Sequence, residues 1–242
     1  RYKLVMGGAG SGKSTNVAMD YIAKLSNPMN YGANLLVVRA SEHSHAQSTF
    51  AELDKAITAL GVRDIWEVRT SNLTMRNKYT DSVIYFRGCN DQRALERLKS
   101  ITCKSGKLCW VWIEEATELR QTDVDIIDDR LRGELPENLY YQITMTFNPV
   151  SATHWIKSVF WDSTDPNIYR CHTTYLDNKF IDPQYAERME RRKLTDPQGY
   201  KIYALGEWGV TEGLVFENWT IGNYSEKEFE NLSIGTDFGF NH

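Results

Sequence analysis

Residues 7–15 read GGAGSGKST and directly follow the apolar run 4–6, which reads LVM. The stretch fits the pattern G-x-x-x-x-G-K-[ST], which is typical of a loop between a strand and a helix. Its four glycines let the backbone turn tightly with its N–H groups pointing inward, so that no Cβ obstructs a phosphate. We therefore interpret the stretch as a phosphate-binding loop and not as a glycine-rich turn that binds nothing.

The residue types in this loop predict how it would hold a nucleoside triphosphate. Lys13 is expected to reach the β and γ phosphates of ATP, and Ser14 to offer its hydroxyl to Mg²⁺. A helix that begins here presents the positive end of its dipole to the anion. The predicted nucleotide-binding residues are Gly7, Gly8, Ala9, Gly10, Ser11, Gly12, Lys13, Ser14 and Thr15.

The composition is that of an ordinary globular protein. The chain has 242 residues, a formal net charge of −4, 41% hydrophobic and 25% charged residues. The length allows one large α/β domain, or one domain and the start of another. We find no secretory signal and no apolar run near the roughly 18 residues that span a membrane, so we expect no membrane partner. The four cysteines form no C-x-x-C pair, which is typical of reduced thiols in a cytosolic protein.

Strands and helices alternate along the predicted pattern. Continuous apolar runs at 34–39 and 108–113 predict strands covered on both faces, as in parallel sheets. Between residues 65 and 87 the period changes to simple alternation, which predicts antiparallel strands at the edge of the sheet. We therefore predict an α/β fold with a mainly parallel central sheet flanked by helices. Further predicted elements are the helices 13–26, 43–60, 91–98, 121–132, 154–161, 183–194 and 197–205, and the strands 140–147 and 168–173.

Two carboxylates, Glu114 and Glu115, come immediately after the predicted strand 108–113. A nucleoside triphosphatase needs one acid to support Mg²⁺ and another to polarise the attacking water. We assign the first role to Glu114 and the second to Glu115, against the alternative of a strand end that carries charge. Thr146 and Asn148 lie at the carboxyl end of the strand 140–147, where they could sense the γ phosphate or form an Asn-Pro turn.

Two basic stretches have open interpretations. The run 97–107 contains Arg97 and three lysines without an acid, which fits a solvated loop or a contact with phosphates. The stretch 187–194, ERMERRKL, is interpreted as the exposed face of a helix, with DNA contact as the lesser alternative.

Taken together, these pieces resemble the large terminase subunit of tailed phages, the motor that packs DNA into the procapsid. The resemblance is carried by GGAGSGKST, LLVVR, WVWIEEA, RLRGE, TFNP, YALGEWGV with GLVF, and GTDFG, which occur in this order along nearly the whole chain. It is closest to the terminases of phages from Gram-positive and related bacteria.

The resemblance implies a P-loop NTPase fold and three regions. Residues 1–150 would be the ATPase core, 151–222 a lid and linker subdomain, and 223–242 a linker with the first strand of a truncated RNase H-like nuclease domain. Asp237 matches a nuclease metal ligand of the family, but its partner carboxylates are missing, so we expect no DNA cleavage. Thr146 and Asn148 match the family's coupling motif.

The resemblance also implies partners and a location. The cofactors would be ATP and Mg²⁺, and the partners would be double-stranded DNA, the portal protein and the small terminase subunit. A homo-oligomeric ring would act at the procapsid in the host cytoplasm and be absent from the mature virion. The alternatives are another P-loop ATPase, such as a helicase-like enzyme, or an assembly module switched by nucleotide.

The chain departs from the family's pattern at Ala9, where many relatives carry an arginine. An arginine finger must then come from elsewhere. Arg97 could act in trans from a neighbouring subunit, and Arg39 could act in cis from the end of its strand. The alternative for both is an ordinary salt-bridged or solvated arginine.

Overall fold

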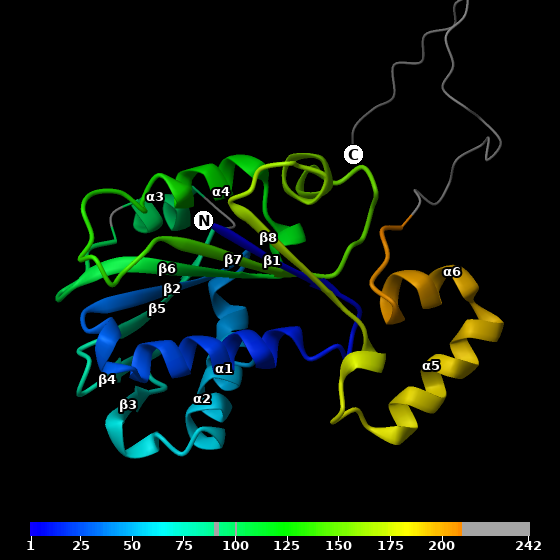
Figure 1. The fold of residues 1–242 in the computed structure, drawn as a ribbon, viewed down its shortest axis with the longest axis horizontal. Coiled ribbons are helices and arrows are strands. Elements are labelled where there is room, and N and C mark those ends of the chain that lie inside the picture. Colours follow the sequence, from blue (N-terminus) through cyan, green and yellow to red (C-terminus); the bar gives the residue numbers. More distant parts are fainter. Residues whose placement is uncertain (90–91, 100, 210–242) are drawn as a thin grey trace, which may run out of the picture. The chain divides into compact units, whose positions relative to one another are not determined.

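A mixed sheet organises the part of the chain that the computed structural model describes, which is residues 1–89, 92–99 and 101–209 (Figure 1). Its eight strands follow the order β3-β4-β5-β2-β6-β7-β1-β8. All pairs from β5 to β8 are parallel, whereas β4 pairs antiparallel with both β3 and β5. The strands are β1 (Tyr2–Gly7), β2 (Ala33–Arg39), β3 (Trp66–Arg69), β4 (Thr74–Asn77), β5 (Val83–Gly88), β6 (Lys107–Glu114), β7 (Gln142–Phe147) and β8 (Ile168–Thr173).

Helices cover both faces of this sheet, as predicted. Figure 1 shows α1 and α2 on one face and α3 and α4 on the other. None of the described helices is long and apolar enough to cross a membrane. The helices are α1 (Lys13–Ser26), α2 (Thr49–Ala59), α3 (Gln92–Lys99), α4 (Gln121–Asp128), α5 (Pro183–Thr195) and α6 (Pro197–Gly199).

Strand β6 shows how the two cores form. Trp110 and Trp112 are fully buried in the core beneath α1 and α2, while Val111 and Ile113 are fully buried in the opposite core. Successive side chains of a strand point to opposite faces, so a continuous apolar run fills both cores at once. The prediction of a strand covered on both faces is confirmed.

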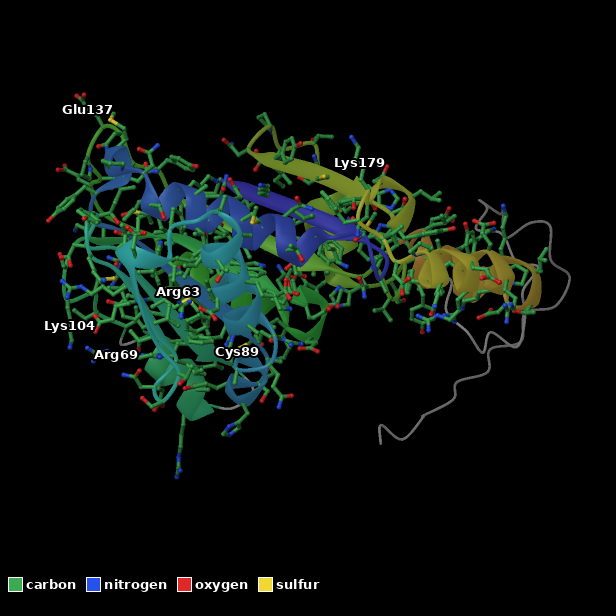
Figure 2. The ribbon with its side chains drawn as sticks, turned by 90° about the horizontal axis from the view of Figure 1, so that it is seen from below. Arg63, Arg69, Cys89, Lys104, Glu137 and Lys179 are labelled. Carbon is green, nitrogen blue, oxygen red and sulfur yellow. The ribbon has the colours of Figure 1, made fainter. Side chains whose placement is uncertain are left out.

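The antiparallel edge is smaller than predicted. Strand β5 is not at the edge, because it lies between β4 and β2 and pairs parallel with β2. Only β3 and β4 form the antiparallel edge, near which Arg63 and Arg69 project (Figure 2). Alternation of apolar and polar residues indicates that one face of a strand is exposed. It does not indicate whether the neighbouring strand runs parallel or antiparallel.

Two predicted helices are too long. The segment 43–60 begins with a 3-10 turn, Glu42–His45, and α2 starts only at Thr49. The His45 ring is buried, and its two nitrogens hydrogen-bond with the Thr49 hydroxyl and the Arg87 carbonyl, so a tertiary contact replaces a regular helix start. Helix α4 ends at Asp128 instead of residue 132, and the N–H groups of Arg130 and Leu131 bond three residues back.

A small helical layer follows β8 and consists of a 3-10 turn (Tyr175–Asp177), α5, α6 and a π turn (Tyr200–Ala204). It has its own core, in which Tyr175, Met189, Tyr200 and Ala204 are buried. Strand β8 itself pairs with β1 in the central sheet, so the predicted division at residue 150 does not separate sheet from lid. The described residues up to 209 cluster as one compact unit. The predicted nuclease strand and Asp237 lie outside the described residues.

Candidate functional site

The predicted phosphate loop joins β1 to α1 at the carboxyl end of the sheet. Strand β1 ends at Gly7 and α1 begins at Lys13. Gly10 and Gly12 adopt φ of 76° and 78°, a left-handed conformation that a Cβ disfavours. These two glycines therefore serve the turn itself, as the sequence predicts.

The outer side of this loop is hydrogen-bonded to the segment that starts at the end of β8. The Ala9 N–H donates to the Tyr203 carbonyl at 2.8 Å, and the Tyr185 hydroxyl donates to the Ala9 carbonyl at 3.0 Å. The Asn178 amide donates to the Gly10 carbonyl at 2.8 Å. Sequence reasoning missed these contacts, because no local pattern links residue 9 to residues near 200.

Gly7 and Gly8 also have a packing role that the sequence motif does not indicate. A Cβ on Gly7 would overlap the Thr173 carbonyl oxygen, and one on Gly8 would overlap the carbonyl oxygens of Tyr203 and Ala204. These neighbours are backbone atoms, which cannot swing aside like a flexible side chain. Gly7 thus allows the end of β8 to lie against the loop, and Gly8 allows the helical layer to pack against it.

Lys13 is buried within the loop, as expected of a lysine that meets phosphates. Its side chain is 8% exposed, and its Nζ donates to the Gly8 carbonyl at 3.1 Å and to Asn148 Oδ1 at 2.5 Å. Burial lowers the pKa of the Lys13 ammonium, and the charges of Glu115 and Glu114 oppose that shift.

One buried donor in the loop supports an anion site. The Ser11 hydroxyl is buried and has no hydrogen-bond partner among the described residues. A buried hydroxyl without a partner costs free energy, which a phosphate oxygen would recover.

Ser14 and Glu114 are brought together as predicted, although they lie 100 residues apart. The Ser14 hydroxyl donates to Glu114 Oε1 at 2.6 Å. Both groups are oxygen donors of the kind Mg²⁺ prefers, and Mg²⁺ commonly takes only one or two protein ligands and completes its shell with water and phosphates. No cluster of three or more His, Cys, Asp or Glu side chains suits a metal within the described residues. The pair therefore fits Mg²⁺ held jointly with a nucleotide.

Thr146 connects this carboxylate to the core of the sheet. Its hydroxyl accepts a hydrogen bond from the buried Trp112 indole at 2.8 Å and lies within hydrogen-bond reach of Glu114 Oε2. Because Thr146 is 1% exposed, this contact is shielded from water. Thr146 thus fixes the orientation of Glu114, and Asn148, two residues further on, contacts Lys13.

Glu115 has an unusual backbone conformation. Its φ of 53° is in the left-handed region, which is uncommon for a residue other than glycine and clusters at functional sites. Burial and the neighbouring charge of Glu114 raise the pKa of the Glu115 carboxyl, while Lys13 and Arg39 lower it. A carboxylate with a raised pKa is a better proton acceptor, which suits the predicted role.

A cavity of about 420 Å³ lies over the inner side of the loop. It is lined by residues 10–15 together with Glu114 and Trp112, so the predicted loop and the predicted acid share one hollow. Ser48, Thr49, Glu52 and Asn178 also line it and were not predicted. Glu52 accepts a hydrogen bond from the Thr15 hydroxyl at 2.9 Å, a contact that depends on the packing of α2 against α1.

Of the two candidate arginine fingers, Arg39 has a described side chain, and that side chain already has partners. Arg39 is 15% exposed, donates to the Ser48 hydroxyl at 3.2 Å and pairs with Glu118 at 3.4 Å. The backbone of Arg97 belongs to α3, but its side chain lies outside the described part, so its role stays a prediction.

A largely parallel sheet with a phosphate loop after its first strand and a carboxylate at the end of β6 defines the P-loop NTPase fold. Within that class, the family model of the phage terminase large subunit matches residues 1–207. The chain belongs to the phage terminase large subunit family.

Relatives and solved structures agree with this assignment. The chain is 32% identical to the large terminase subunit of Bacillus phage SPP1, over 98% of this chain and 57% of that protein. It is 28% identical to the PBSX phage terminase large subunit of Bacillus subtilis strain 168, over 99% of this chain and 58% of that protein. The chain therefore spans little more than half the length of these relatives.

Two solved structures share the fold at low sequence identity. The large terminase of a thermophilic bacteriophage superposes with a TM-score of 0.72 at 19% identity, covering 88% of this chain and 50% of that one. That terminase has also been solved with ADP and with ATP-gamma-S. The ATPase domain of the Thermus phage P74-26 large terminase superposes with a TM-score of 0.57 at 12% identity, covering 86% of this chain and 88% of that one.

Proposed function

We propose that this chain is an ATPase that drives the translocation of double-stranded DNA into a procapsid. The observation that carries the proposal is the meeting of Lys13, Ser14 and Glu114 at one cavity, with Glu115 next along the chain. Loop, metal-holding pair and proton acceptor are the three parts that hydrolysis of a nucleoside triphosphate requires. The nucleotide complexes of a similar terminase support ATP as the ligand.

Each residue of the site has a separate role in the proposed reaction. The inner N–H groups of the loop and Lys13 bind the β and γ phosphates, and Ser14 and Glu114 would hold Mg²⁺. When bound, Mg²⁺ neutralises part of the charge on the phosphate oxygens. Glu115 orients a water molecule and accepts its proton as the water oxygen attacks the γ phosphorus and the bond to the bridging oxygen breaks.

The contact between Asn148 and Lys13 would depend on whether a γ phosphate is bound, which would couple β7 to the nucleotide state. In the structure Asn148 Oδ1 accepts from Lys13 Nζ, the group that a γ phosphate would attract. Binding of ATP would draw Lys13 towards the phosphate, and hydrolysis would return it to Asn148. Thr146, on the same strand end, contacts Glu114, so both predicted coupling residues contact the reacting region.

We extend the proposal to the assembly that the family implies. A homo-oligomeric ring docked on the portal protein, with DNA delivered by the small terminase subunit, would pump DNA in the host cytoplasm. One similar solved structure is named a DNA packaging motor, which supports the packaging of DNA as the task of this assembly. An arginine finger from Arg97 of a neighbouring subunit, or from Arg39, belongs to the same proposal.

ATP hydrolysis measured with and without double-stranded DNA tests the proposal. We expect the wild-type chain to hydrolyse ATP in the presence of Mg²⁺ and to do so faster with DNA. Glu115→Gln should bind ATP but lose turnover by at least about 100-fold, which is the scale of general-base catalysis. A wild-type chain that hydrolyses no ATP with any DNA or portal protein would refute it, and binding without turnover would favour an assembly module.

A further inference from the structure

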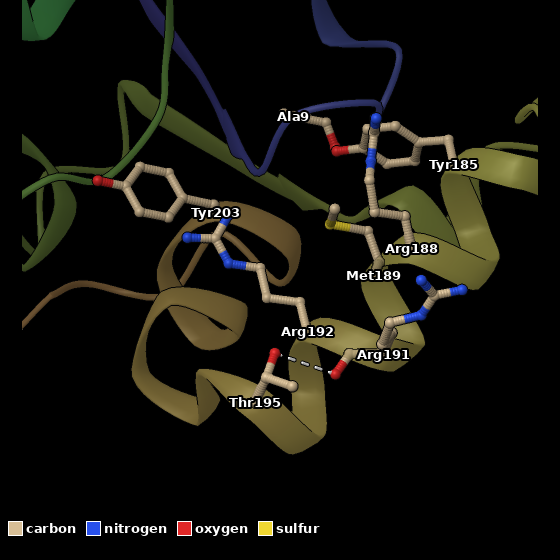
Figure 3. Close-up of a pocket in the computed structure, with 8 residues that line it drawn as sticks. All are labelled: Ala9, Tyr185, Arg188, Met189, Arg191, Arg192, Thr195 and Tyr203. Carbon is tan, nitrogen blue, oxygen red and sulfur yellow. Dashed lines mark hydrogen bonds between the residues drawn. The ribbon is translucent and has the colours of Figure 1, made fainter.

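A second hollow, the arginine pocket, lies on the outer side of the phosphate loop. It has a volume of about 500 Å³ and is shown in Figure 3. Three arginines and no carboxylate line it among the described residues, in a chain whose net charge is −4. The residues that matter here are Ala9, Tyr185, Arg188, Arg191, Arg192 and Tyr203.

The arginines of this pocket can exchange their present partners. Arg188 is exposed and has no ion pair among the described residues; its guanidinium lies 5.1 Å from the centre of the Tyr185 ring. Arg191 pairs with Glu187 at 3.2 Å, but both side chains are more than 70% exposed, and such surface pairs contribute little to stability. Arg192 donates from Nε and Nη2 to the Asp196 carboxylate at 3.1 and 3.0 Å, and this pair is also partly exposed. An anion entering the pocket therefore competes with water at Arg188 and with partly exposed ion pairs at Arg191 and Arg192.

The walls between the arginines are aromatic. Tyr203 is 50% exposed and lies under the Arg192 guanidinium at 4.7 Å, and the Tyr185 ring lies under Arg188. Guanidinium groups bind phosphate oxygens through paired N–H donors, and exposed tyrosines offer apolar surface and hydroxyls to sugars. This combination suits a sugar-phosphate chain better than an isolated carboxylate.

The anion that fits the pocket is not the ATP bound at the catalytic site. The nucleotide cavity is lined by residues 10–15 on the inner side of the loop, whereas the arginine pocket reaches the loop only at Ala9. Both backbone polar groups of Ala9 already bond to Tyr203 and Tyr185. A phosphate in the arginine pocket must therefore come from another molecule.

We propose that the arginine pocket binds the phosphate backbone of double-stranded DNA. This inference rests on the proposed function, in which DNA is the substrate that is moved. DNA bound here would touch Arg188, Arg191 and Arg192. The aromatic partners of Arg188 and Arg192, which are Tyr185 and Tyr203, both hydrogen-bond to Ala9. The contact thus links the DNA backbone to the phosphate loop, so occupation of the pocket can alter ATP turnover.

The test is DNA binding by fluorescence anisotropy, with a labelled duplex and the chain of residues 1–242, over a range of salt concentrations. The variant combines Arg188→Ala with Arg191→Ala. We expect its Kd for DNA to rise at least tenfold and the slope of log K against log salt to fall by about 1.8, because each phosphate contact contributes about 0.9. Its acceleration of ATP hydrolysis by DNA should fall in parallel.

A matched control combines Arg63→Ala with Arg69→Ala, which removes the same charge near the antiparallel edge (Figure 2). Its Kd should stay within twofold of the wild-type value. Replacing Arg188 and Arg191 by lysine should restore part of the affinity and the salt slope, because charge returns without the planar fork. Circular dichroism of each variant confirms that the fold is retained.

Three results would overturn the inference. One is a Kd and salt slope of the Arg188, Arg191 variant equal to those of the wild type. Another is an equal loss in the Arg63, Arg69 control. The third is displacement of DNA by polyglutamate at the same charge concentration, which would make the pocket a docking site for an acidic protein. A wild type that binds no DNA and is not accelerated by it would instead refute the proposed function.

Discussion

Replacement of Thr146 by valine tests whether the predicted coupling residue holds the acid of the nucleotide site. Valine has nearly the shape of threonine but no hydroxyl. The Trp112 indole N–H would lose its acceptor at 2.8 Å, and Glu114 would lose its contact at Oε2 while keeping the Ser14 hydroxyl. The substitution therefore removes hydrogen bonds without opening a cavity.

The expected cost follows from burial. Trp112 is 0% and Thr146 is 1% exposed, so water does not replace the lost partner. An unsatisfied buried donor costs about 1–3 kcal/mol, and the lost contact to a charged group adds to this, so we expect the free energy of unfolding to fall by about 2–4 kcal/mol. In a domain of this size each kcal/mol lowers Tm by about 2–4 °C.

Urea unfolding and ATP turnover measure the two consequences separately. Thr146→Ser keeps the hydroxyl and loses one methyl, which costs about 1 kcal/mol. We expect Thr146→Ser to retain turnover and Thr146→Val to lose at least tenfold, because Glu114 is no longer oriented. The double variant Trp112→Phe, Thr146→Val should lose less free energy of unfolding than the sum of the two single variants. The reason is that phenylalanine has no indole N–H to leave without an acceptor. Equal stability of the serine and valine variants, or strict additivity, would refute the reasoning.

Three further outcomes are expected. Gly8→Ala should weaken ATP binding, measured by calorimetry, and lower the free energy of unfolding by about 1–3 kcal/mol, measured by urea unfolding. The reason is that the new Cβ would overlap the Tyr203 carbonyl oxygen. The acid limb of the kcat–pH profile should lie above the ordinary pKa of a glutamate, because the pKa of Glu115 is raised. A raised pKa also means that the ionised Glu115 side chain destabilises the fold. Glu115→Gln should therefore raise Tm at neutral pH, and this increase should vanish at a pH low enough to protonate Glu115. Tyr185→Phe should raise the Kd for ADP about two- to tenfold, the scale of one hydrogen bond to the Ala9 carbonyl, and an unchanged Kd would show that this bond does not support the loop.

The parts of the site that the sequence predicts are those with a short-range signal. The phosphate loop, α1 and the buried run of β6 each occupy a continuous stretch with its own spacing or hydrophobicity. Glu114 was predicted because it ends a buried strand downstream of a phosphate loop, although an acid at a strand end is by itself a weak signal. The pairing of Ser14 with Glu114 follows from the fold, since parallel strands present their carboxyl ends at one edge.

The rest depends on contacts between distant segments. Glu52 and Asn178 reach the nucleotide cavity only because α2 packs on α1 and the chain returns after β8 to the loop. The place of β5 within the sheet, and the pairing of β8 with β1, are choices of strand order that no local pattern encodes. Arg39 does end its strand as predicted, but its partner Glu118 comes from a turn 79 residues away.

Gly7 and Gly8 carry a consequence for how such a chain could change over generations. Their missing side chains accommodate backbone oxygens of Thr173, Tyr203 and Ala204, a constraint that persists whether or not a nucleotide ever binds. A descendant that had ceased to hydrolyse ATP would still need both glycines to keep its fold. In such a descendant, substitutions should appear first at Lys13 and Glu115, whose side chains serve the chemistry. Gly7 and Gly8 should remain glycine.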